Sequence, residues 1–85
     1  MYQFMSPTVF RYKDYRFFFF SREEKRVHIH VECPEGMAKF WIEPVVSLDS
    51  YYGLNKKKLQ ELQKVVEERK NEIIKAWHKH FGRSS

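Results

Sequence analysis

Hydrophobic and polar residues alternate without interruption between Val27 and Glu32. Because a strand points successive side chains to opposite faces, this alternation predicts a strand with one apolar face and one polar face. The polar face would carry His28, His30 and Glu32. Histidine has the unperturbed pKa closest to neutral pH, so two histidines on one face indicate proton transfer, metal binding or phosphate contact. A plain amphipathic strand is the alternative.

Two further strands are predicted upstream. Residues 8–12 are strand formers, and residues 15–21 follow them after a tight turn at Lys13 and Asp14. The second of these strands contains four consecutive phenylalanines, residues 17–20, which place aromatic rings on both of its faces. This pattern favours a central strand that is covered on both sides. The alternative is that one aromatic face stays open as an interaction surface.

The strand at 27–33 is followed by a short turn and a fourth strand at 37–43. The proline and glycine of the turn suit a three-residue loop, which would pair Ile29 with Trp41. A two- or four-residue loop instead pairs Ile29 with Phe40 and collects the apolar residues of both strands on one face. We expect the second register, because a slip of one residue would move that apolar set to water. The polar face then carries His28, His30, Glu32, Lys39, Trp41 and Glu43.

A linker and one long helix are predicted to complete the chain. Residues 44–54 combine a proline, turn-forming residues and a few apolar side chains, as linkers do. Asn55 suits the N-cap and Gly82 the C-cap of one amphipathic helix over about residues 55–81. Its length would be roughly 40 Å, so it either extends beyond the sheet or bends near residues 69–71. Its apolar stripe consists of Leu59, Leu62, Val66, Ile73, Trp77 and Phe81.

Together these elements predict a single α+β domain over residues 1–85. It would be a four-stranded antiparallel β-meander with one long C-terminal α-helix packed on one face. The aromatic share of 18% supplies the large side chains that so small a core needs. Cys33 is the one cysteine, so no internal disulfide forms and a reducing compartment fits. We find no membrane span and no signal-peptide pattern, and expect a cytoplasmic protein that needs no cofactor.

Charge and the polar face together indicate a class of partner. The formal net charge of +5 and the pI near 9.4 favour an anionic partner such as RNA, DNA or an acidic protein. A soluble basic protein without such a partner has the same composition.

The polar face itself allows three interpretations. His28 and His30 suit acid/base chemistry on RNA, with Lys39 stabilising negative charge and Trp41 stacking a base. Arg26, Arg16 or Lys25 are further candidates for the positive charge, and Glu32 and Arg26 join Trp41 as candidate binding residues. Alternatively, the two histidines and Glu32 bind a metal ion, although a metal site needs three or four converging ligands. The third interpretation is a solvated polar face without a function.

Several segments resemble a small bacterial family of unknown function whose hallmark is a Pro-Pro-His-x-His-Val strand. The resemblance covers nearly the whole chain from Met5, which favours Met5 over Met1 as the start. Arg26-Val27 stand where that family has its two prolines, so the strand starts differently here. The matching segments are 5–9, the aromatic second strand, 28–32, 38–44 and 74–82.

The resemblance implies a biological setting. Members of that family are commonly described as candidate toxins of two-gene toxin–antitoxin modules. Its histidine pair corresponds to His28 and His30, and its Ala-Lys-x-Trp strand to Ala38, Lys39 and Trp41. Our leading hypothesis is a toxin that binds or cleaves RNA without a metal and is neutralised by a small antitoxin-like protein. A non-catalytic interaction or regulatory module with an aromatic surface, which could form a homo-oligomer, and a metal-binding module are the alternatives.

Overall fold

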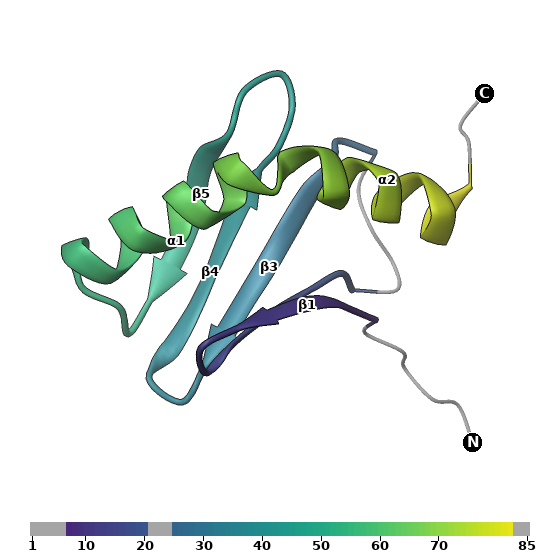
Figure 1. Ribbon diagram of the computed structural model, residues 1–85. Helices are drawn as coiled ribbons and strands as arrows, with labels where there is room; N and C mark the ends of the chain where they lie inside the picture. Colours follow the sequence, from purple (N-terminus) through teal and green to yellow (C-terminus); the bar gives the residue numbers. More distant parts are fainter. Residues whose placement is uncertain (1–6, 21–24, 83–85) are drawn as a thin grey trace.

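The computed structural model describes residues 7–20 and 25–82. They form a five-stranded antiparallel sheet with the strands in sequence order, followed by two consecutive helices on one face (Figure 1). No helix among these residues is long and apolar enough to cross a membrane. The elements are β1 (Thr8–Tyr12), β2 (Tyr15–Phe18), β3 (His28–Cys33), β4 (Gly36–Trp41), β5 (Ser47–Tyr52), α1 (Lys56–Glu68) and α2 (Lys70–Phe81).

The prediction of an α+β fold with an antiparallel meander is confirmed, and two of its details are wrong. The sheet has a fifth strand, β5, inside the segment 44–54 that was predicted to be a linker. The predicted helix over 55–81 is interrupted at Arg69, which ends α1 and precedes α2. The bend that the sequence offered as one of two outcomes near residues 69–71 is therefore the observed one.

The β1–β2 hairpin uses the predicted turn at Lys13 and Asp14. Tyr12 pairs with Tyr15, and Lys13 has a positive φ of 54°. Strand β2 ends at Phe18 rather than continuing to residue 21, and Ser21 lies outside the described residues.

The β3–β4 register is the one that burial predicted. Ile29 pairs with Phe40, and His30 pairs with Lys39. A two-residue turn joins the strands, so Cys33 pairs with Gly36. The three-residue loop that the turn composition suited does not form, because it would have placed the apolar residues of one strand on the opposite face from those of the other.

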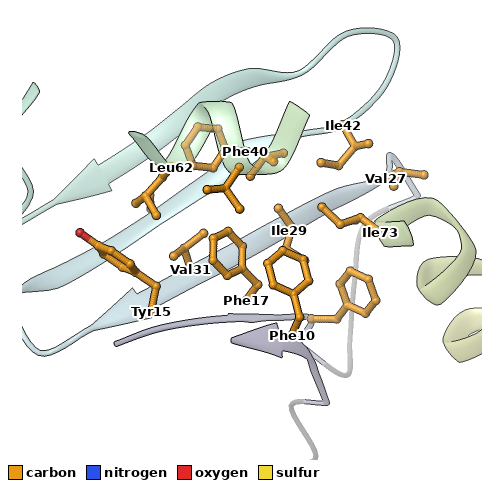
Figure 2. Close-up of a cluster of buried hydrophobic side chains, with 14 of the residues drawn as sticks. Phe10, Tyr15, Phe17, Val27, Ile29, Val31, Phe40, Ile42, Leu62 and Ile73 are labelled. Carbon is orange, nitrogen blue, oxygen red and sulfur yellow. The ribbon is translucent and has the colours of Figure 1, made fainter. Parts of the chain in front are cut away.

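The core lies between the sheet and the two helices (Figure 2). Phe17 and Phe40 from the sheet, and Leu62 and Ile73 from the helices, are fully buried there. Burying each such side chain contributes about 1.5–3 kcal/mol relative to leaving it in water. Glu61 of α1 also accepts a hydrogen bond of 2.6 Å from the Tyr12 hydroxyl, which ties the helix to the first hairpin.

The break between the helices is held against the first strand. Arg69 has φ −109° and ψ 22°, outside helical geometry, and its N–H donates to the Val65 carbonyl. Its guanidinium carbon lies 3.6 Å from the centroid of the Phe10 ring. Its Nε and Nη2 also donate to the two carboxylate oxygens of Glu72 at 2.9 and 3.1 Å. Beyond the break, Trp77 of α2 packs on Phe19 and on His28, the first residue of β3.

Candidate functional site

The sheet face turned away from the helices, here called the open face, brings most of the predicted site residues together. In the β3–β4 ladder His28 pairs with Trp41, and His30 pairs with Lys39. Directly paired residues share a face, so these four side chains form one cluster. Figure 1 shows the helices over the opposite face of the sheet, with α2 extending past the end where β3 begins. Trp77 of α2 reaches His28 at that end.

His28 is buried, although the sequence placed it on an open polar face. Its exposed fraction is 1%, and its Nδ1 lies 2.8 Å from the Arg26 carbonyl oxygen. The centroid of its ring lies 5.5 Å from that of Trp41 and 5.2 Å from that of Trp77. The ring of Trp77 comes from α2, and this contact covers the histidine. Direct contact between His28 and a substrate would therefore require the surrounding rings to move.

His30 is half-buried between aromatic rings. The centroid of its ring lies 4.4 Å from that of Phe20 and 5.6 Å from that of Phe18. Burial, followed by the positive charges that His28 and Lys39 can carry, lowers the pKa of His30 to about 4. The imidazole is accordingly neutral at pH 7. It can accept a proton or a hydrogen bond, but it holds no proton for use as a general acid at that pH.

Two cationic side chains lie against the ring of Trp41. The guanidinium carbon of Arg26 lies 4.2 Å from the centroid of its ring, and Nζ of Lys39 lies 4.4 Å from the same centroid. Arg26 is further held by its Nε, which donates to the Glu43 carbonyl oxygen at 2.8 Å. Such cation–π contacts contribute about 0.5–1 kcal/mol at exposed sites. We call the group of Arg26, Lys39, Trp41 and Asp49 the tryptophan platform.

Asp49 is the fourth residue of this platform. The sequence did not predict that it belongs to the site. The Trp41 Nε1–H donates to Asp49 Oδ1 at 3.0 Å, and Lys39 Nζ lies 3.8 Å from Asp49 Oδ2. A register shift in the β4–β5 ladder makes this possible, because Lys39 pairs with Ser50 whereas Phe40 pairs with Leu48. The intervening Asp49 is the extra residue of a bulge, a feature that re-aims side chains. Asp49 lies in the segment 44–54, whose turn-forming residues were interpreted as those of a linker.

Glu32 does not converge with the histidines. Its carboxylate accepts a hydrogen bond of 2.8 Å from Arg16, which also donates to the Thr8 hydroxyl. Arg16 is thus placed beside Glu32 rather than on the tryptophan platform, and Lys25 is exposed. Among residues 7–20 and 25–82, no three His, Cys, Asp or Glu side chains gather as a metal site would require.

These features define a class: small α+β proteins in which helices cover one sheet face and cationic and aromatic side chains gather on the other. The family model described as a domain of unknown function, DUF4160, matches residues 14–78, which is more than half of the chain. The protein therefore belongs to that family. This confirms the resemblance to a small family of unknown function that the sequence indicated. No curated protein and no solved structure matches the chain significantly.

Proposed function

We propose that this protein binds single-stranded RNA on its open face. The observation that carries the proposal is the tryptophan platform, where Arg26 and Lys39 both lie against the ring of Trp41. Proteins that bind single strands combine positive charge for phosphates with aromatic or guanidinium planes for bases. Arg26 is exposed and offers both its charge and its plane, and the net charge of +5 favours an anionic partner.

Binding fits this geometry better than cleavage by a histidine pair. A two-histidine mechanism needs one imidazole that gives up a proton and another that accepts one, both within reach of the substrate. His30 is neutral at pH 7, since its pKa is lowered to about 4. His28 is buried beneath Trp41 and Trp77. The roles of His28, His30 and Lys39 in catalysis thus remain a hypothesis, to be tested by incubating labelled RNA with the protein and looking for shortened products.

The biological setting that we propose is the toxin of a two-gene toxin–antitoxin pair, with a small antitoxin-like protein covering the open face. The support is the family resemblance of the sequence together with the RNA-binding geometry. Controlled expression of the wild type should arrest bacterial growth, and Lys39→Ala should relieve the arrest. Growth without arrest in the wild type would contradict this setting.

A His28→Ala/His30→Ala double variant separates cleavage from binding, provided that it folds. Growth arrest that persists in this variant argues against cleavage.

The RNA-binding proposal is tested by fluorescence anisotropy with a labelled, unstructured oligoribonucleotide. We expect Arg26→Ala, Lys39→Ala and Trp41→Ala each to weaken binding about ten-fold, which corresponds to about 1.4 kcal/mol. The matched controls are Lys56→Ala and Lys64→Ala, which remove the same charge from exposed positions on α1. Equal losses in the control and platform variants would show a non-specific charge effect and would overturn the proposal.

A protein-binding role is the second candidate, and one observation favours it. Strand β5 lies at the edge of the sheet and exposes Tyr51 and Tyr52 by 54% and 63%. An exposed edge strand is a template for pairing with another chain. Size-exclusion chromatography with light scattering tests for a dimer through this edge. If β5 pairs with a second copy, Tyr51→Lys should dissociate the dimer, because a charge on an exposed edge strand opposes pairing with another chain.

A further inference from the structure

A hollow of about 280 Å³ opens on the same sheet face, beside the tryptophan platform. Its walls come from the chain just after β2 and from strands β3, β4 and β5. The hollow adjoins the platform because Lys39 belongs to both, lining the hollow and lying against Trp41. The open-face side chains that line it are Phe20, His30, Met37, Lys39, Ser50 and Tyr52.

The size of this hollow limits what it accepts. Pockets for drug-sized ligands occupy roughly 300–1,000 Å³, so a hollow of 280 Å³ suits one small ring system rather than a whole nucleotide. Phe20 and Tyr52 are 41% and 63% exposed and line the same hollow, and exposed aromatic side chains that gather in one place mark interaction sites. Their rings and the Met37 side chain offer apolar and aromatic contact to a flat ligand.

The polar groups of the hollow suit a base. His30 contributes an imidazole ring that lies 4.4 Å from the Phe20 ring, centroid to centroid, and extends the aromatic lining of the hollow. The Ser50 hydroxyl donates to Asp49 Oδ2 at 3.3 Å, and its oxygen keeps the capacity to accept a hydrogen bond from a ligand. Lys39 supplies positive charge at the boundary with the platform, where the phosphate of a bound strand would lie.

We propose that this hollow is a nucleobase site, which takes one unstacked base of the strand whose phosphates contact Arg26 and Lys39. This inference rests on the proposed function, because the base that enters the hollow belongs to the RNA strand that the open face is proposed to bind. Single-stranded RNA is commonly held in this way, with bases splayed out and stacked on aromatic rings while basic side chains follow the backbone.

Uncharged nucleosides test the hollow independently of the platform, because they carry no phosphate. Adenosine and uridine are titrated into the protein while the Met37 methyl resonance is followed by NMR. That resonance is assigned with Met37→Leu. We expect a saturable shift in the millimolar range, and Tyr52→Ala should weaken binding at least five-fold. Val45→Ala is the control, because Val45 is 63% exposed and does not line the hollow.

The same variants are then measured with RNA. Tyr52→Ala should weaken RNA binding about ten-fold without changing its salt dependence, since no charge is removed. Phe20→Ser is a second variant on the opposite wall and should act in the same direction. Tyr52 is largely exposed, so its replacement leaves the fold intact, which circular dichroism verifies.

The outcomes separate the two proposals. If RNA binds through Arg26 and Lys39 but nucleosides do not shift the Met37 methyl resonance, the nucleobase site is overturned and the RNA proposal stands. If nucleosides move Met37 and RNA does not bind, the nucleobase site is supported and the RNA proposal fails. An unchanged RNA affinity in both Tyr52→Ala and Phe20→Ser would also overturn the nucleobase site.

Discussion

His30 makes a pH-dependent contribution to stability, whose sign follows from its lowered pKa. In the unfolded chain the pKa is that of free histidine, near 6.5, whereas burial and the neighbouring His28 and Lys39 lower it to about 4 in the fold. The unfolded state thus binds more protons between these values. The contribution is complete above about pH 6.5 and is lost as the pH falls toward 4. Asp49 opposes the shift.

We expect acidification from pH 7.5 to 4.5 to remove on the order of 2 kcal/mol of unfolding free energy through His30, once screening by solvent is allowed for. Urea denaturation across that range measures this loss, and His30→Gln is the reference because it cannot titrate. The pKa values of Glu35 and Glu61 are lowered from the usual glutamate value of 4.5, so their contributions to stability are lost only as the pH falls past that value. Between pH 6.5 and 5, the difference between the wild type and His30→Gln therefore reports the contribution of His30. An identical pH dependence in His30→Gln would contradict this assignment.

Gly36 occupies a position where no side chain fits. A Cβ atom there would lie 2.0 Å from the Tyr52 carbonyl oxygen and 2.8 Å from the Gly53 Cα, both of which are backbone atoms. Gly36→Ala should therefore lower the unfolding free energy by about 1–3 kcal/mol, as other overpacked sites do. Denaturant unfolding measures the change. Val45→Ala, at a position that is 63% exposed, should lie within about 0.5 kcal/mol of the wild type.

The burial of His28 is an example of a feature that could not be predicted from the sequence. The alternation around His28 correctly predicted its strand and its cross-strand partner. Its burial was not predictable, because the covering ring of Trp77 lies 49 positions further along the chain and arrives through the packing of α2. The pattern of one strand carries no information about such a contact.

At the scale of elements, the helix break is stabilised from outside the helix. Arg69→Ala should lower the unfolding free energy by about 1 kcal/mol, because it removes the contact with Phe10 as well as the pair with Glu72. Glu72→Gln removes only the ion pair and should cost at most a few tenths of a kcal/mol. Urea denaturation of both variants separates the two effects. Equal losses would show that the Phe10 contact contributes nothing.

Elements with a regular period were predictable, and elements without one were not. The β3–β4 register followed from the requirement to bury Ile29 opposite Phe40. Strand β5 was missed because its bulge at Asp49 breaks the two-residue alternation and four of its six residues are exposed. The helix break was only one of two predicted outcomes, because the apolar spacing of a helix resumes after Arg69 with Ile73 and Trp77.

At the scale of the whole molecule, the sheet separates two chemistries. Its helix side is a closed apolar core, and its open side gathers cations, aromatic rings and the hollow on a continuous surface. The sequence predicted His30, Lys39 and Trp41 on one face, because they share one ladder. It missed Asp49 and Tyr52, because their place depends on β5. The exposed Phe20 belongs to the phenylalanine run for which an open aromatic face was the alternative prediction.

The salt dependence of RNA binding tests the central claim most directly. Each phosphate contact on a single strand contributes about −0.7 to the slope of log affinity against log salt concentration. If Arg26 and Lys39 each contact one phosphate, the wild type should give a slope near −1.4, which is twice the value for one contact. Lys39→Gln should reduce it to about −0.7 while Lys64→Gln leaves it unchanged. A slope that does not change in Lys39→Gln, or one that falls equally in Lys64→Gln, would contradict RNA binding by the open face.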